Sequence, residues 1–178
     1  MSLETRNANT EGRGEITIRE LIRSSLRMRP NRIVVGEVRG SEALDMLQAM
    51  NTGHDGSLST GHANSTKDMI SRLETMVLSG ANLPIIVVRQ QISSAIDILV
   101  HLSRLRDRSR RVTEICEVLG MENGEVQLSP LYRFRERGEE EGKIIGQLES
   151  CGVAMQHIEK LRMAGLEDAI VMEGEEIK

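Results

Sequence analysis

Two short segments carry the residues best suited to chemistry. Residues 32–40 form an apolar run that contains Glu37, and residues 59–65 surround His62 with small side chains. One helix-length segment separates them, so we expect Glu37 and His62 to follow two neighbouring strands of an α/β sheet, at the edge where open sheets bind ligands. A carboxylate and an imidazole that face one crevice can orient a water molecule and contact a phosphate.

Glu37 has two interpretations that the sequence leaves open. It either caps the following helix or pairs with Arg39, or it polarises a water that attacks a γ-phosphate or holds the shell of a magnesium ion through water. Gly36 lets a ligand or a loop approach the backbone closely at this point.

His62 differs from the other three histidines in its surroundings. Gly61 and Ala63 flank it, and Asn64 and Ser65 follow as capping residues, which is how a loop presents a side chain at a helix N-terminus. The other interpretation makes His62 a packing residue. We expect structural roles for His54, His101 and His157, and the spacing of the histidines and of Cys116 and Cys151 fits no zinc site.

Arg6 and Arg13 lie in a polar, glycine-containing arm, residues 1–14, ahead of the first capped helix. Such an arm can reach a neighbouring subunit, where arginine stabilises charge on a phosphoryl group. By contrast, surface pairing or solvation is the expectation for Arg72 and Arg104.

The composition limits the class of protein. The net charge is −4. Because Tyr132 and Phe134 are the only aromatic residues, the core must be aliphatic and methionine-rich. The absence of a basic block with interleaved aromatics argues against nucleic-acid binding. No apolar run approaches the roughly 20 residues of a membrane span, so we expect a cytoplasmic protein.

Periodicity predicts alternating helices and strands in the first half of the chain. Capping residues Thr17, Ser41 and Ser65 begin helices, Pro84 begins another that runs to about Ala95, and Gly80 ends the third. The continuous apolar run 33–38 predicts a strand covered on both faces, beside a short strand over 57–60.

The second half predicts an antiparallel finish followed by a tail. Strands are expected over 98–105, 111–121 and 126–134 in the same sheet, then a charged linker over 136–142. A helical appendage over 143–178 completes the chain, with a helix over 153–164 and an acidic tail from residue 167. Residues 15–135 then form one domain.

The motifs from Leu3 to about Leu166 resemble the C-terminal half of the secretion and pilus-assembly ATPases of type II and type IV systems. The nearest subgroup is the CpaF/TadA-like ATPases of tight-adherence (Flp) pili. The resemblance rests on residues 3–6, 11–15, 25–30, 32–40, 43–57 and 62–65.

The resemblance implies an incomplete RecA-like P-loop ATPase core with its Walker B strand and histidine box. Glu37 becomes the catalytic carboxylate and His62 the residue linked to the γ-phosphate. Arg6, Arg13, Arg39 and Gly36 are assigned to nucleotide binding. The implied ligands are ATP and Mg²⁺, with magnesium held through water near Glu37. The implied assembly is a homohexamer that works with an inner-membrane platform protein at the cytoplasmic face of the membrane.

Two departures from the family pattern affect the expected activity. The phosphate-cradling G-x-x-x-x-G-K-[ST] loop is missing, as if the chain began after it, so we expect weak nucleotide binding and no turnover by the chain alone. Missing strands would expose an apolar edge and favour self-association. Gly61 stands where a larger residue is expected and predicts a looser loop. The alternative function is a non-catalytic oligomerisation module that contacts the pilus platform, and a third is a phosphate-binding regulator.

Overall fold

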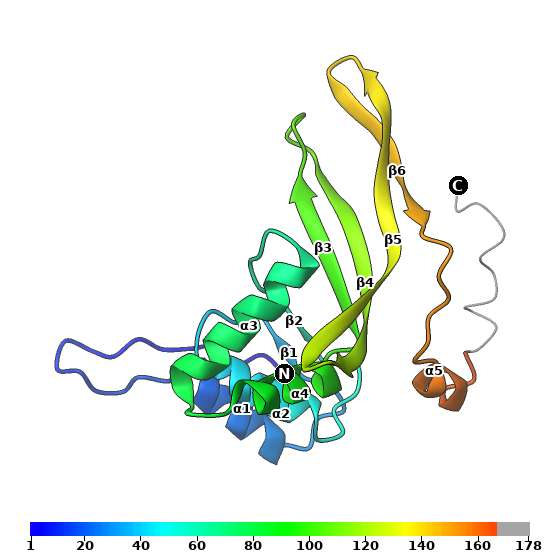
Figure 1. Ribbon diagram of the computed structural model, residues 1–178. Helices are drawn as coiled ribbons and strands as arrows, with labels where there is room; N and C mark the ends of the chain where they lie inside the picture. The colour runs from blue at the N-terminus through cyan, green and yellow to red at the C-terminus, as the bar shows by residue number, and fades with distance from the viewer. Residues whose placement is uncertain (167–178) are drawn as a thin grey trace.

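The computed structural model describes residues 1–166, which fold into a helical base and an extended sheet (Figure 1). In Figure 1, α1 to α4 gather around the short strands β1 and β2, and the long strands rise from this base. The elements in chain order are α1 (Ile18–Arg27), β1 (Val34–Val35), α2 (Glu42–Met50), β2 (Leu58–Ser59), α3 (Thr66–Gly80), α4 (Ile85–Ala95), β3 (Ile98–Arg104), β4 (Arg110–Glu122), β5 (Glu125–Glu140), β6 (Lys143–Ser150) and α5 (Glu159–Met163).

Two of the predicted helix caps are confirmed and one is wrong. Thr17 and Glu20 form a reciprocal capping box at α1, and Ser65 Oγ accepts from the amide of Asp68 at α3. Ser41 makes no side-chain cap at α2. Instead, the carboxylate of Glu42 folds back and accepts hydrogen bonds from the amides of residues 39 and 40, which precede the helix.

The core lies between α2, α3 and α4. Its most buried side chains are aliphatic, as the composition predicts, and come from all three helices: Ala43, Leu47, Leu73, Val77, Val88 and Ile92. The end of α3 passes so close to the start of α2 that a Cβ at Gly80 would lie 2.3 Å from Ser41 Cβ. Gly80 is the last residue of α3, and this close approach explains why glycine is needed there.

The strands form two sheets where one was predicted. β1 and β2 make a parallel pair, and β3 to β6 make a separate antiparallel meander in sequence order. The prediction that the 98–134 strands extend the first sheet is wrong, because among the described residues β3 to β6 pair only with one another. β1 is also covered on one face only: Val35 is buried, whereas Val34 and its register partner Leu58 are exposed. Self-association through this apolar pair stays a prediction.

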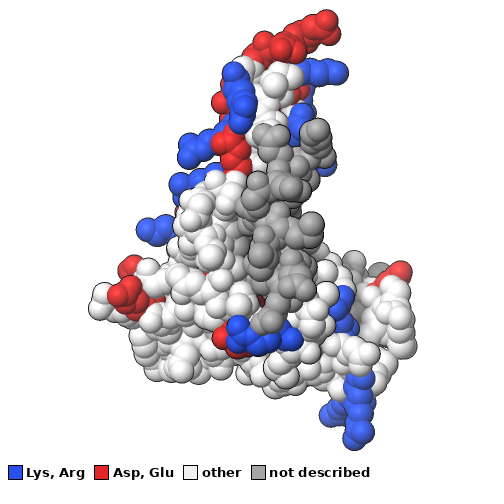
Figure 2. Space-filling model, turned by 90° about the vertical axis from the view of Figure 1, so that its right-hand side faces the viewer, with Lys and Arg blue, Asp and Glu red and all other residues white. Residues whose placement is uncertain are grey.

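The predicted linker over 136–142 is a β-hairpin. Residues 136–140 complete β5, and Glu141 and Gly142 turn the chain with positive φ into β6. The charged side chains that suggested a linker form ion pairs instead. Arg106 pairs with Glu136, and Arg137 pairs with Glu149. Figure 2 shows acidic and basic side chains interleaved on the narrow upper part of the molecule.

The C-terminal appendage is less helical than predicted. Residues 143–150 form strand β6, and the helix expected over 153–164 is limited to α5. The predicted acidic tail from residue 167 lies outside the described residues. Within residues 1–166, no helix combines the length and apolar character needed to cross a membrane.

Replacing Gly80 with alanine is expected to destabilise the fold. The added methyl would meet Ser41 Cβ, which cannot rotate away, so the free energy of unfolding should fall by about 1–3 kcal/mol despite alanine's better helix propensity. Denaturant unfolding measures the effect. Gly138→Ala is the matched control, since nothing lies within 4 Å of its Cβ position. Equal stability of the two variants would contradict the close approach.

Candidate functional site

The parallel pairing of β1 and β2 brings Glu37 and His62 together, as predicted. Beyond the two strands the ladder continues with the amide of Val38 donating to the carbonyl of Thr60 at 3.0 Å. Thr60 Oγ1 also donates to the carbonyl of Gly36 at 2.6 Å. These bonds hold the two strand ends in register, and His62 Nε2 lies 3.1 Å from Glu37 Oε1.

The two carboxylate oxygens of Glu37 have different surroundings. Oε2 accepts a hydrogen bond from Arg39 Nη2, and this bond holds the pKa of Glu37 below its ordinary value. Oε1 is buried and accepts no hydrogen bond from residues 1–166, because the nearby His62 nitrogen lacks hydrogen-bond geometry. Glu37 is therefore an ionised carboxylate with one oxygen that receives no hydrogen bond from the described residues.

The loop that carries His62 packs against the side chain of Met69 in α3. A Cβ at Gly61 would lie 2.5 Å from Met69 Cε, so the thioether of Met69 occupies the space of the missing side chain. This close approach gives a physical reason for glycine at position 61, and a looser loop stays a prediction. Ser65 then caps α3, and the His62 side chain, 84% exposed, projects from the end of the loop.

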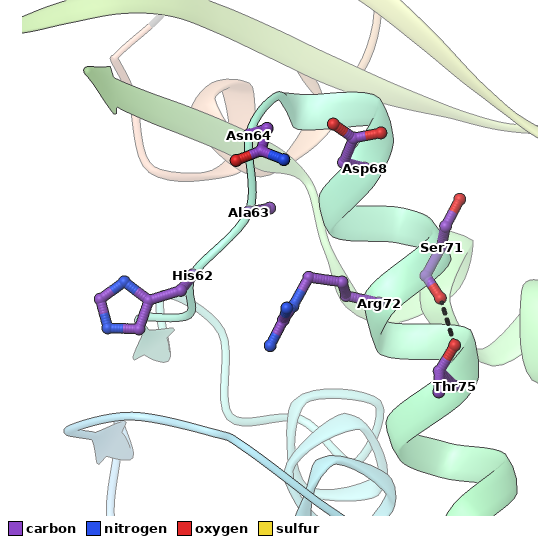
Figure 3. A pocket seen from close by; sticks show the side chains of 7 residues that line it. All are labelled: His62, Ala63, Asn64, Asp68, Ser71, Arg72 and Thr75. Atoms are coloured by element: carbon purple, nitrogen blue, oxygen red, sulfur yellow. Dashed lines mark hydrogen bonds between the residues drawn. The ribbon is translucent and has the colours of Figure 1, made fainter. Parts of the chain in front are cut away.

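An open hollow of about 560 Å³ lies beside His62 (Figure 3). The loop contributes His62, Ala63 and Asn64, and α3 contributes Asp68, Ser71, Arg72 and Thr75. Sequence reasoning placed Arg72 among solvated surface arginines and missed it as a lining residue. Its spacing of four from Asp68 on one helix face was the available signal.

Arg6 and Arg13 lie apart from this site. The arm folds on itself, with Arg6 bridged to Ile16 and its Nε donating to the carbonyl of Gly14 at 2.6 Å. Figure 1 shows the arm projecting from the base. Neither arginine contacts Glu37 or His62 within the described part of the chain, so their role toward a neighbouring subunit's nucleotide stays a prediction.

The sequence and the fold agree with one family. The type II/IV secretion system protein family matches residues 3–175. The chain belongs to this family.

Several relatives support this assignment. A putative conjugal transfer protein of Mycobacterium tuberculosis is 46% identical over 127 residues, which cover 71% of this chain and 36% of that protein. The type IV secretion system protein PtlH of Bordetella pertussis is 42% identical over 112 residues, 60% of this chain and 33% of that protein. The chain thus spans about a third of the length of these relatives.

A solved structure supports the fold. The VirB11 ATPase of the Brucella suis type IV secretion system, crystallised in complex with sulphate, matches with a TM-score of 0.55 and 36% sequence identity. The match covers 57% of this chain and 32% of that chain.

Gly36 and Arg39, which the resemblance assigns to nucleotide binding, flank Glu37 closely in the chain. The Cβ position of Gly36 is open, with nothing within 4 Å, and Arg39 is engaged by Glu37. Among residues 1–166, no group of three His, Cys, Asp or Glu side chains could hold a metal directly. Binding of magnesium through water near Glu37 is a proposal.

Replacing Arg39 with glutamine is expected to raise the pKa of Glu37 toward its ordinary value. Because the folded-state pKa lies below that value, ionised Glu37 favours folding at neutral pH, and this contribution disappears as the pH falls through the lowered pKa. Carboxyl carbon NMR titration measures the change, and Arg104→Gln, with the same charge loss on another strand, is the control. An unchanged Glu37 pKa in Arg39→Gln would show that the bond does not persist in solution.

Proposed function

We propose that this chain is the Walker B and histidine-box part of a motor ATPase that couples ATP hydrolysis to secretion or pilus assembly. The observation that carries the proposal is the juxtaposition of Glu37 and His62 at the ends of two paired parallel strands. The family and the relatives named for conjugal transfer and type IV secretion support it. In this proposal β1 and β2 belong to a RecA-like sheet.

The proposed roles follow from the surroundings of each side chain. Glu37 accepts a hydrogen bond from the attacking water through the oxygen that no other group satisfies, and Mg²⁺ is held nearby through water. His62 contacts the γ-phosphate and transmits its presence to α3, whose cap lies three residues later. Hydrolysis then changes the position of α3.

The proposed assembly is a homohexamer at the inner face of the cytoplasmic membrane, working with a membrane platform protein. The projecting arm supports this part, because Arg6 and Arg13 belong to a segment that extends away from the helical base, where a neighbouring subunit could meet it. The motifs of residues 11–15 and 25–40 support assignment to the CpaF/TadA-like subgroup of tight-adherence pili.

The second candidate function is a non-catalytic oligomerisation module that contacts the platform. One observation favours it: the exposed pair Val34 and Leu58 offers an apolar contact. The two candidates differ in whether a protein that joins this chain to a phosphate loop hydrolyses ATP through Glu37.

Glu37→Gln in such a longer protein is expected to lower kcat by about 100-fold or more while ATP affinity is kept. The amide keeps the shape of the side chain but is a far weaker base and acceptor for the attacking water. Steady-state kinetics and nucleotide titration separate the two effects. The 178-residue chain alone is the control and should show no turnover above background. An unaltered kcat would favour the non-catalytic module.

His62→Ala in the longer protein is expected to weaken the coupling of hydrolysis to secretion or pilus output while ring formation is preserved. The imidazole is mostly exposed, so its removal should leave the melting temperature nearly unchanged. Pilus or secretion output per ATP hydrolysed, together with the melting temperature, tests this. Normal output with a lowered melting temperature would make His62 a packing residue.

A further inference from the structure

The hollow beside His62 is lined along one face of α3. Asn64, Asp68, Arg72 and Thr75 recur at helical spacing on this face, and Ser71 completes it. The opposite face of α3 carries the buried residues Ile70, Leu73, Met76 and Val77. The polar face is therefore not needed for the core, and its side chains are free to meet a ligand.

Arg72 is the cation of this face that no acid neutralises. Within residues 1–166 it makes neither an ion pair nor a hydrogen bond. Arginines around it are paired instead, since Arg89 binds Glu74 and Arg39 binds Glu37. In Figure 3 the guanidinium of Arg72 extends from α3 across the hollow toward His62, whereas the carboxylate of Asp68 points toward the far end.

Arg72 and His62 thus line the same hollow from two elements, although in Figure 3 the His62 ring projects from the loop on the side away from α3. A guanidinium offers planar, paired N–H donors that match phosphate oxygens, and it keeps its charge at every physiological pH. The His62 imidazole also lies 3.1 Å from Glu37 Oε1. An anion that enters the hollow can meet the Arg72 guanidinium beside the loop that carries His62.

We propose that Arg72 is a phosphate-binding residue of the Glu37–His62 site. Together with His62, Arg72 binds the phosphate chain of a nucleoside triphosphate. The proposal rests on the proposed nucleotide function of that site. It assigns the hollow to the phosphates and makes α3 a direct contact of the ligand. Loss of the terminal phosphate then releases α3 at Arg72 as well as at the histidine loop.

The test measures binding of inorganic tripolyphosphate and of ATP to the 178-residue chain. Side-chain NMR signals of Arg72 Nε–H and of the His62 ring report contact, and titration gives the affinity. Arg72→Gln is compared with Lys67→Gln, which removes the same charge from an exposed position of α3 outside the hollow. His62→Ala tests the proposed function separately.

The expected result is that tripolyphosphate shifts both signals and that Arg72→Gln weakens its binding by about tenfold, with little effect of Lys67→Gln. Unchanged melting temperatures confirm that the variants fold. Binding that His62→Ala weakens but Arg72→Gln does not would overturn the role of Arg72 and leave the proposed function standing.

Other outcomes also decide the matter. Equal losses in Arg72→Gln and Lys67→Gln would show general charge attraction and overturn the proposal. Unchanged phosphate affinity with a smaller assembly by light scattering would place Arg72 at an interface between copies and overturn it as well. No shift of the Arg72 signal at millimolar tripolyphosphate or ATP would overturn the Arg72 contact, whereas the Glu37→Gln kinetics in the longer protein test the nucleotide function separately.

Discussion

The site depends on the parallel pairing of two very short strands. β1 and β2 comprise two residues each, yet the bonds from Leu58 to Ile33 and from Val38 to Thr60 extend their register to both ends. A slip of one residue would turn the side chains of one strand to the other face. The 3.1 Å approach of His62 to Glu37 therefore exists only in this register.

The loop that carries His62 is connected rigidly to the rest of the protein. Met69 fills the space at Gly61, and Ser65 fixes the first turn of α3. One residue later, Thr66 Oγ1 donates to Glu114 of β4 at 2.6 Å, and Glu114 also pairs with Arg133 of β5. These contacts link the first turn of α3 to the antiparallel sheet.

The two oxygens of the Glu37 carboxylate differ in their hydrogen bonding. Arg39 holds one oxygen of Glu37 and lowers its pKa, while the other oxygen is buried without a hydrogen-bond donor from the described residues. An unsatisfied buried acceptor costs free energy, which a bound water or ligand group recovers. The charge of Glu37 is thus stabilised and its hydrogen-bonding capacity is left open.

The sequence by itself determined the first four helices, the caps at Thr17 and Ser65, the antiparallel finish and the meeting of Glu37 with His62, because each follows from local spacing or from strand order. Only the tertiary structure decided which strands share a sheet, that residues 136–150 form a hairpin, and that Arg72 faces the hollow. Charged residues look alike in a linker and in a solvated hairpin, and the spacing of Asp68 and Arg72 is the same on a plain solvated helix face as beside a hollow. Such features depend on contacts between parts of the chain that no local pattern encodes.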